Sequence, residues 1–376
     1  MQTELLSPLA EVLPFDVTQP WSLDSVRRAG CVDESTRIQA EEMSVQELTS
    51  TPYLLFGSIA SLEEQRALVK CGDAEVQNTI LIGDRALRGE DETVMDKTQV
   101  PASGDKHDYL SLAPYWWPNP QTSDGLPYIR IDGEVNPETR GVHTDFQRRG
   151  SMIERVDSLA SAYYITRDTK YSTKVLSLLR TWFIDPATRM KPSLNHAQAI
   201  PGSEDGRAFG IIEWAGIDTL LDAIAVLRAS QGLPLEVNNS LVAWFQEYTD
   251  WLLNSPLGQA ASTRTNNHGT MYDLQVCSLL TFLERDEEAR DILESAKTKR
   301  IATQIEPDGR QPEELKRGRR GLAYSVLNLT ALHKLAHLGH RVGVDLESFE
   351  TDDGRSISKA HEYVLPYLEN EQQWTS

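Results

Sequence analysis

The chain has 376 residues, of which 40% are hydrophobic and 25% are charged, so its composition is that of a globular protein long enough to bury a large core. Its formal net charge of −19 argues against a nucleic-acid partner, because phosphate binding needs a basic face. The same charge repels polyanions at long range, so a polyanionic substrate would require basic residues gathered at the binding site.

The N-terminal segment lacks a basic stretch followed by an apolar one, so we expect a secreted or extracytoplasmic location only if a signal was removed from this chain. No segment approaches roughly 18 consecutive apolar residues, which predicts a soluble protein without a membrane partner. The three cysteines, Cys31, Cys71 and Cys277, are scattered and odd in number, which favours neither a disulfide framework nor a metal site. The oligomeric state stays open.

Most of the chain has the periodicity of helices. One helix is expected between Leu62 and Leu87, and apolar residues then recur at three- and four-residue steps in seven further segments. These segments are 152–163, 175–182, 217–224, 241–252, 271–283, 288–297 and 322–338. Alternating strand patterns are scarce, so the fold class is all-α. We expect an N-terminal arm over 1–50, a main domain over 51–345 and an acidic helical extension over 346–376.

Three long irregular segments interrupt these helices, at residues 98–145, 184–207 and 254–269. They contain tryptophan, tyrosine, histidine and asparagine in place of the Ser, Lys and Glu that are typical of disorder, which favours functional loops. Helices joined alternately by short turns and long loops fit helical hairpins arranged in a ring with the loops at one face. A plain helical bundle fits the periodicity nearly as well.

Asn266, Asn267 and His268 stand at the expected start of a helix. One asparagine would suffice to cap the helix, and Asn266 is the better candidate for that role. Two amides and an imidazole at the positive end of a helix dipole also suit an anion such as a carboxylate. The segment therefore favours capping and anion binding about equally.

A basic run, Lys316–Arg320, leads into another apolar helix that carries Tyr324. Such a run is usually only a solvated face, but cations are disfavoured at a helix N-terminus, so an anionic ligand would compensate them. Tyrosine at this position is more often core than catalyst. A neighbouring arginine would lower the pKa of the phenol from its usual value near 10.

Aromatic and polar side chains in two of the long loops are candidates for substrate binding. The run Tyr115, Trp116 and Trp117 follows His107 in a proline-rich loop, where no regular element would bury both tryptophans, and exposed aromatic faces stack on sugar rings. A loop plug held by tryptophan is the structural alternative. The second group precedes another helix and consists of Asn195, His196, Gln198 and Arg207.

Together these segments resemble the alginate lyase-like superfamily of polysaccharide lyases, in particular its polymannuronate and glucuronan lyases. The likeness is carried by HDYLSLAPYWWPNP, DGLPYIRIDGEVNPE, TWFIDPATRMKPSLNHAQAIPG, GRAFGIIE, NNHGTMYDLQ, DGRQPEELKR and AYSVLNL, and it covers about residues 55 to 340. The resemblance implies an incomplete (α/α) toroid with a substrate groove across its loop-rich face.

The resemblance also implies a catalytic set of asparagine, histidine, arginine and tyrosine. By motif these are Asn267, His268, Tyr324 and an arginine that such motifs place about six residues before the tyrosine, where this chain has Gly318. Arg317 is the favoured candidate, and Arg319 or Arg320 would serve if the spacing differs. Arg320 is otherwise expected to bind substrate. No metal or other cofactor is required, because arginine and amides can neutralise a carboxylate.

The expected reaction is β-elimination on an acidic polysaccharide, a 1,4-linked uronan. Asn267, with His268 or Arg317, would neutralise the uronate carboxylate. Tyr324 as phenolate would take the C5 proton, or His268 would do so in an anti elimination, and Tyr324 would protonate the leaving O4. The product would carry a 4,5-unsaturated uronate.

Two other functions fit the sequence less well. A glycoside hydrolase on a similar toroid would use a pair of carboxylates such as Glu213, Asp145 or Glu313, but none of these forms a distinctive pair in the sequence. A non-catalytic carbohydrate-binding protein would keep the groove without the chemistry.

Overall fold

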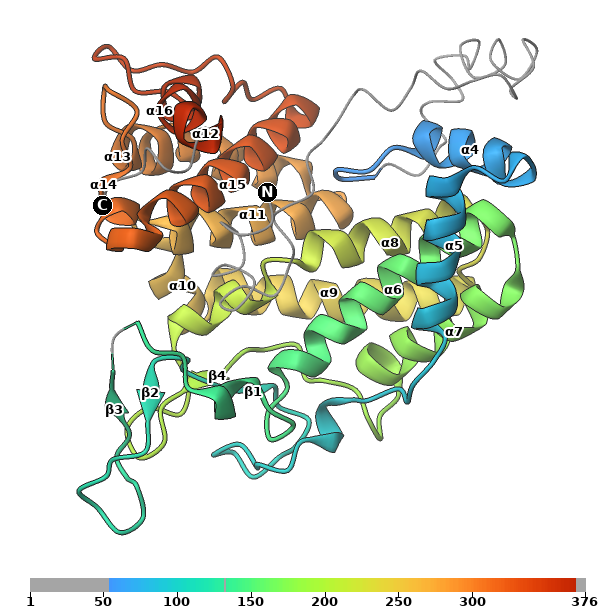
Figure 1. Ribbon diagram of the computed structural model, residues 1–376, viewed down its shortest axis with the longest axis horizontal. Coiled ribbons are helices and arrows are strands. Elements are labelled where there is room, and N and C mark those ends of the chain that lie inside the picture. Colours follow the sequence, from blue (N-terminus) through green and yellow to red (C-terminus); the bar gives the residue numbers. More distant parts are fainter. Residues whose placement is uncertain (1–53, 132, 370–376) are drawn as a thin grey trace.

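The computed structural model describes residues 54–131 and 133–369, and most of them belong to helices (Figure 1). Four long helices pack against one another in chain order and form an inner row. They are α6 (Phe146–Thr166), α8 (Ile217–Ala229), α11 (Asn267–Phe282) and α15 (Gly321–Val342). The helix α11 is buried along its whole length except at His268, as expected for a helix surrounded by other helices.

A second row of helices covers the first, each burying one face. It contains α5 (Ala74–Ala86), α7 (Thr169–Leu179), α9 (Leu235–Asn254), α12 (Asp286–Ala296) and α16 (Ile357–Glu369). The helices α5 and α7 pack on α6, α9 packs on α11, α12 packs on α11 and α15, and α16 packs on α15. The all-α class is confirmed, and these paired rows are those of an incomplete (α/α) toroid.

Short helices complete the connections. The α-helices among them are α4 (Ile59–Leu68), α10 (Pro256–Ser262), α13 (Ala302–Gln304) and α14 (Pro312–Leu315). The 3-10 helices are η2 (Val69–Cys71), η3 (Val94–Asp96), η4 (Pro137–Arg140), η6 (Ala208–Trp214) and η8 (Gly318–Arg320), and two π-helical turns are η5 (Arg180–Ile184) and η7 (Lys297–Ile301). None of the helices within the described ranges is both long and apolar enough to cross a membrane.

Two sequence predictions of local structure are corrected. The single helix expected between Leu62 and Leu87 is two helices, because Gly72 turns the chain at a φ of +66° and the Asp73 side chain caps α5 by accepting the backbone N–H of Glu75 and of Val76. The expected loop at 254–269 contains α10, which has Ser255 as its N-cap and a proline at its first position.

Four short strands lie in the remaining long loops. The strands β1 (Leu110–Leu112) and β4 (His196–Ala199) pair in parallel, and β2 (Trp116–Trp117) pairs antiparallel with β3 (Ile129–Arg130). Figure 1 shows that β1–β4, α10 and α14 lie in the left half of the view, whereas α4, α5 and α7 lie at the right. The loop-bearing elements therefore gather at one end of the helical rows.

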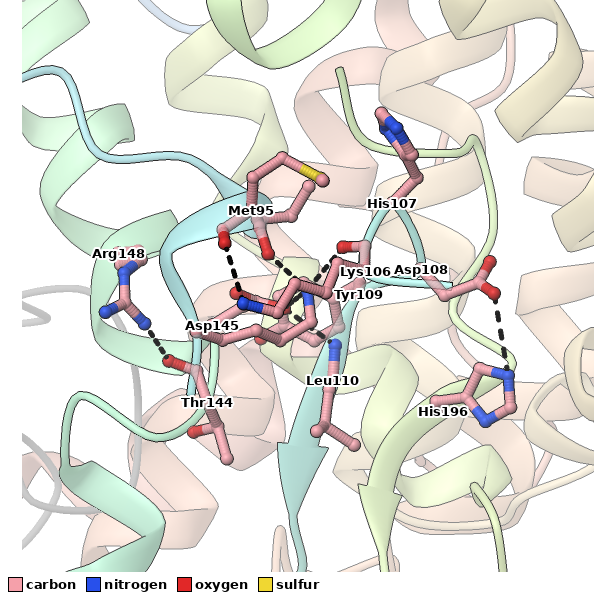
Figure 2. A network of polar contacts seen from close by, with 12 residues as sticks. Met95, Lys106, His107, Asp108, Tyr109, Leu110, Thr144, Asp145, Arg148 and His196 are labelled. Carbon is pink, nitrogen blue, oxygen red and sulfur yellow. Dashed lines mark hydrogen bonds and ion pairs between the residues drawn. The ribbon is translucent and has the colours of Figure 1, made fainter. Parts of the chain in front are cut away.

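A buried polar network attaches the first long loop to the N-terminus of α6. Nζ of Lys97 lies 2.8 Å from the Asp145 carboxylate and donates to the backbone oxygens of Val94 and Lys106 at 2.5 and 2.6 Å. The Asp145 carboxylate also accepts the backbone N–H of Leu110 at 2.9 Å, at the start of β1 (Figure 2). We call Lys97, Asp145 and these backbone partners the anchor network. It holds β1, and with it the following segment, in place.

The main hydrophobic core includes residues from Leu54 to Val364, and Leu110, Leu112 and Ala199 form a small separate cluster between β1 and β4. The helix α16 contributes Ile357, Ala360 and Val364 to this core. The N-terminal arm expected over 1–50 lies outside the described residues. The division of the chain into arm, main domain and C-terminal extension stays a prediction.

Candidate active site

The helix α11 begins at the asparagine pair, as the sequence predicted. Asn266 occupies the N-cap position, but its side chain makes no capping hydrogen bond. Instead the carboxylate of Glu314 in α14 accepts the backbone N–H of Asn267 at 2.7 Å and its amide nitrogen at 2.5 Å. The expectation that Asn266 is the cap is therefore corrected: the orphan donor at this helix end is satisfied by a residue 47 positions away in the sequence.

His268 lies half-buried among three arginines. Its ring meets Phe209 edge-on at 5.0 Å between centroids. Burial, with the positive charges of Arg264, Arg317 and Arg207, lowers the pKa of His268 to about 3. The imidazole is consequently neutral at ordinary pH and has a nitrogen able to accept a proton.

Tyr324 lies in the first turn of α15, where its hydroxyl accepts a hydrogen bond from Arg317 at 3.3 Å. The Arg317 guanidinium also lies over the phenol ring, 4.7 Å from its centroid. Of the three arginines that the sequence offered, Arg317 is the one whose contact with Tyr324 the structure records. Arg320 instead donates to the hydroxyl of Tyr115 at 3.5 Å.

The Tyr324 phenol is protonated in the resting protein. Burial and the neighbouring Tyr115 hydroxyl raise its pKa to about 12, and they outweigh Arg317, which lowers the pKa. The hydroxyls of Tyr115 and Tyr324 lie close enough to influence each other, so the first loop and α15 meet at this pair of phenols. The site thus holds a neutral imidazole and a neutral phenol.

A basic platform adjoins His268. Arg207 and Arg264 lie over the ring of Phe209, with their guanidinium carbons 4.8 and 4.3 Å from its centroid. Among the residues that the structure describes, neither arginine has a carboxylate within ion-pair distance, and Nε of Arg207 is buried without a hydrogen-bond partner. Cations held in this way suit an anionic ligand.

The position of Arg264 is set from beneath by Arg300. The Arg300 guanidinium pairs with Asp273 at 2.7 Å and donates to the backbone oxygens of Arg264 and Ser262. Gly269 makes this approach possible, because a Cβ there would lie 2.1 Å from the Arg264 oxygen. The glycine that follows Asn267 and His268 thereby allows the basic platform to lie against the start of α11.

The two tryptophans lie in the β2–β3 hairpin, which projects from the helices at the lower left of Figure 1. Both are half-buried, and Nε1 of Trp117 donates to the backbone oxygen of Glu134 at 3.1 Å. Tyr115 comes directly before β2, and its backbone oxygen accepts from Ile131. The hairpin is thus joined to the Tyr324 site through Tyr115.

The remaining polar candidates, which lie in or near β4 and before β1, make contacts of their own. Asn195 is exposed and accepts a hydrogen bond from Nε1 of Trp251, and buried Gln198 has a φ of +50°, which is rare for a residue other than glycine. His196 lies 3.9 Å from the Asp108 carboxylate (Figure 2). Nδ1 of His107 lies 2.7 Å from the Arg189 backbone oxygen. Within the described ranges, His107, Asn195, His196 and Gln198 make no hydrogen bond or ion pair with Tyr324 or His268.

Sequence reasoning missed Glu314, Phe209 and Arg264. Arg264 had a usable signal, since it is a cation just before a helix N-terminus, like the run before Tyr324. Phe209 and Glu314 had none, because a phenylalanine or an acidic residue next to a helix has no distinguishing pattern. Across residues 54–131 and 133–369, no group of three or more His, Cys, Asp or Glu side chains is placed to hold a metal ion.

The three carboxylates considered for a glycoside hydrolase make other contacts in the structure. Asp145 is buried in the anchor network, and Glu213 is buried and accepts a hydrogen bond from the Tyr109 hydroxyl at 2.8 Å. Glu313 is exposed and pairs with Lys316. None of them contacts the paired phenols or the basic platform through an interaction recorded within the described ranges.

Comparisons with known proteins give one consistent family. The family model described as "Alginate lyase" matches residues 93–374. A crystal structure of an alginate lyase from Bacteroides ovatus is 33% identical in sequence, with a TM-score of 0.80, and the match covers 86% of this chain and 87% of that one. The search of curated proteins finds no match.

Two more distant structures share the fold. The alginate lyase A1-III from Sphingomonas species A1 is 20% identical with a TM-score of 0.54, and the match covers 84% of this chain and 79% of that one. A variant of A1-III complexed with a tetrasaccharide is 18% identical with a TM-score of 0.54, over 83% of this chain and 77% of that one.

Proposed function

This chain belongs to the alginate lyase family and is a polysaccharide lyase, and we propose that it cleaves a 1,4-linked uronan by β-elimination at the site formed by Asn267, His268, Arg317 and Tyr324. The observation that carries this proposal is the meeting of two segments far apart in the sequence. Glu314 joins the start of α11 to α14, and Arg317 and Tyr324 follow in the same stretch of chain. A neutral imidazole, a neutral phenol, an amide and an arginine are thereby brought to one place.

The first task of such a site is to neutralise the uronate carboxylate. The C5 hydrogen is a very weak acid because the carboxylate next to it already carries a negative charge. Arg317 and the Asn267 amide, supported by the positive charges of Arg207 and Arg264, would bind that carboxylate and stabilise the charge that develops on it. Donors fixed in position before the reaction are an effective means of such stabilisation.

The second task is proton transfer. The C5–H bond breaks, its electrons form the C4–C5 double bond, and the C4–O4 bond breaks as O4 takes up a proton. Tyr324 is protonated in the resting site and would supply the proton to O4. His268 is neutral and would accept the C5 proton when that hydrogen and O4 lie on opposite faces of the sugar ring.

In a polymer whose C5 hydrogen and O4 lie on the same face of the sugar ring, one group can both remove the C5 proton and protonate O4. Tyr324 would then act as phenolate first and as phenol afterwards, and Arg317 at 3.3 Å would stabilise the phenolate. His268 would remain a neutral hydrogen-bonding partner. The stereochemistry of the substrate thus decides which of the two residues is the base.

The neighbouring sugars would bind on either side of this centre. The platform of Arg207, Phe209 and Arg264 would bind a second carboxylate, and the half-buried tryptophans Trp116 and Trp117 would stack on a sugar ring. The remaining polar candidates, His107, Asn195, His196 and Gln198, would line more distant parts of the groove.

The test is to incubate the protein with polymannuronate, polyguluronate and glucuronan and to follow the ultraviolet absorbance of the 4,5-unsaturated product. We expect absorbance to rise on at least one of these polymers. The variant His268→Gln then assigns the base: it should abolish cleavage of a polymer with opposite-face geometry and only slow cleavage of one with same-face geometry. Folded protein that gives no unsaturated product on any uronan would contradict the proposal.

A further inference from the structure

Glu314 is a buried acid at the junction of the site, in the short helix α14, and is only 2% exposed. Its two carboxylate oxygens are both used by one residue, since one accepts the Asn267 backbone N–H and the other accepts the Asn267 amide nitrogen. The start of α15 packs closely on α14 at Gly321, where a Cβ would lie 3.1 Å from the Leu315 Cα. The two hydrogen bonds to Asn267 hold Glu314 against the start of α11.

We call the two hydrogen bonds from Asn267 to Glu314 the clamp. The clamp determines which end of the Asn267 amide, NH2 or oxygen, faces Glu314. An ionised carboxylate can only accept hydrogen bonds, so it must face the NH2 end of the amide. The other end, Oδ1 of Asn267, is buried and has no hydrogen-bond partner among the described residues. In this orientation Asn267 offers an acceptor at its free end, and an acceptor cannot bind a substrate carboxylate.

We propose that Glu314 is a positioning residue of the lyase reaction, whose carboxyl group turns the Asn267 amide and so decides whether its free end offers an acceptor or a donor to the substrate. A protonated Glu314 can still accept the backbone N–H with one oxygen while its O–H donates to Oδ1 of Asn267. The Asn267 amide group is then flipped, so that its oxygen faces Glu314 and its NH2 group becomes the free end. This inference rests on the proposed function, in which Asn267 binds the uronate carboxylate.

Both forms of Glu314 occur near neutral pH. Burial raises the pKa of its carboxyl group to about 7, against the hydrogen bonds from Asn267 and the charge of Arg317, which lower it. The charged groups that face it are Arg317 and Glu313. A uronate carboxylate bound beside Asn267 adds a negative charge, which favours the protonated, donor-presenting form further.

The test compares the wild-type protein with Glu314→Gln and Glu314→Leu, and uses Glu313→Gln as the matched control because Glu313 is exposed in the same helix. Glutamine at 314 can accept the Asn267 backbone N–H with its oxygen and donate to Oδ1 with its nitrogen, which holds the amide permanently in the donor orientation. We would measure kcat/KM on a uronan that the wild type cleaves, across the pH range on both sides of 7.

We expect the ratio of wild-type to Glu314→Gln kcat/KM to fall by about tenfold for each pH unit above about 7, because kcat/KM reports groups of the free enzyme. Dividing the two profiles cancels the titration of His268 and Tyr324. Glu314→Leu should lower kcat/KM by about 10²-fold below pH 7, since the amide is no longer held, and its profile should lack the fall above pH 7 that Glu314 causes. Glu313→Gln should keep the wild-type fall in kcat/KM, with its midpoint moved to slightly lower pH, because the Glu313 charge that is lost raises the pKa of Glu314 in the wild type.

A Glu314→Gln profile that superimposes on the wild-type profile overturns the proposal, and so does a folded Glu314→Leu variant with unchanged kcat/KM. If Glu314→Leu fails to fold, the glutamine variant decides alone.

If the wild type cleaves no uronan, the proposed function fails, and Glu314 is tested by calorimetric binding of saturated oligouronates. The wild type should then bind more weakly as the pH rises through 7 while Glu314→Gln does not. An equal pH dependence, or no binding by either protein, overturns the inference.

Discussion

The anchor network and the basic platform are both polar regions near the loops, but their charges are arranged in opposite ways. In the anchor network, Lys97 is fully buried and faces the Asp145 carboxylate at 2.8 Å. In the platform, Arg207 and Arg264 lie over Phe209, and no described carboxylate lies within ion-pair distance of either. A buried charge is compatible with a stable fold when it is paired, whereas cations held together without a counterion favour binding of an external anion.

The difference matters more because the protein as a whole is acidic. With a net charge of −19, the chain as a whole repels a polyanion, and the effect is screened beyond roughly 8–10 Å at physiological salt. Three arginines around His268 nevertheless place positive charge at the site. At neutral pH we therefore expect substitutions in the site to change catalysis and binding at constant stability, and substitutions in the anchor network to do the reverse.

The largest effect is expected at Tyr324. Tyr324→Phe removes the hydroxyl that would protonate O4, so kcat should fall by about 10²–10⁴-fold, the contribution of a general acid or base. The ring, with its contact to the Arg317 guanidinium, is kept, so the midpoint of thermal unfolding should change little. The measurement is initial rate by ultraviolet absorbance together with a thermal melt. Near wild-type activity would show that Tyr324 transfers no proton.

The next effect tests the anchor network. Lys97→Met leaves Asp145 buried without its countercharge and should lower the free energy of unfolding by about 3–5 kcal/mol, as measured by urea denaturation. The double variant Lys97→Met/Asp145→Leu should recover most of that loss, because no buried charge is left alone. Activity per folded molecule should stay near that of the wild type, since neither residue contacts the site. A loss below about 1 kcal/mol would show that water reaches this pair.

A smaller effect is expected on the platform. Arg264→Gln removes a cation that would bind a second carboxylate and should raise KM by about tenfold, equivalent to about 1.4 kcal/mol, with little change in kcat. The increase should be greatest at low salt, because salt screens the lost attraction. Arg310→Gln is the control, since Arg310 is half-exposed and already paired with Asp308. Equal effects of the two variants on KM would show that Arg264 acts only through the overall surface charge and does not bind a substrate carboxylate.

An effect of similar size concerns stability in acid. His268 stays neutral in the folded protein down to about pH 3, whereas its pKa in the unfolded chain is near 6.5. The unfolded state therefore binds one more proton between these values, so His268 causes stability to be lost as the pH falls from 6.5 toward 3. His268→Gln should lose less stability than the wild type between pH 7 and 4, by about 1–2 kcal/mol once screening is allowed for.

Urea denaturation at the two pH values measures this difference. The control is His361→Gln, since His361 is exposed on α16. An equal acid loss in the wild type and in His268→Gln would mean that solvent, and not the ring of arginines, governs the His268 environment.

Apolar periodicity predicted the helices of both rows because each helix buries a face against a neighbour. Burying one face requires apolar residues every three or four positions, which is visible in the sequence. Periodicity was least accurate where a single residue decides the boundary. Gly72 divides the first expected helix in two, and Ser255 with Pro256 begins α10 inside an expected loop. Such boundaries depend on one backbone angle or one cap, which apolar spacing does not reveal.

The sequence by itself determined the all-α class and the family, and its motifs named Asn267, His268 and Tyr324 as candidates. Only the tertiary structure decided which arginine contacts Tyr324, that Glu314 and not Asn266 satisfies the start of α11, and that Arg264 joins Arg207 beside His268. The physical reason is range. A helix is stabilised by residues three and four positions apart, whereas a clamp, an ion pair or a shifted pKa depends on groups that the chain brings together from distant positions.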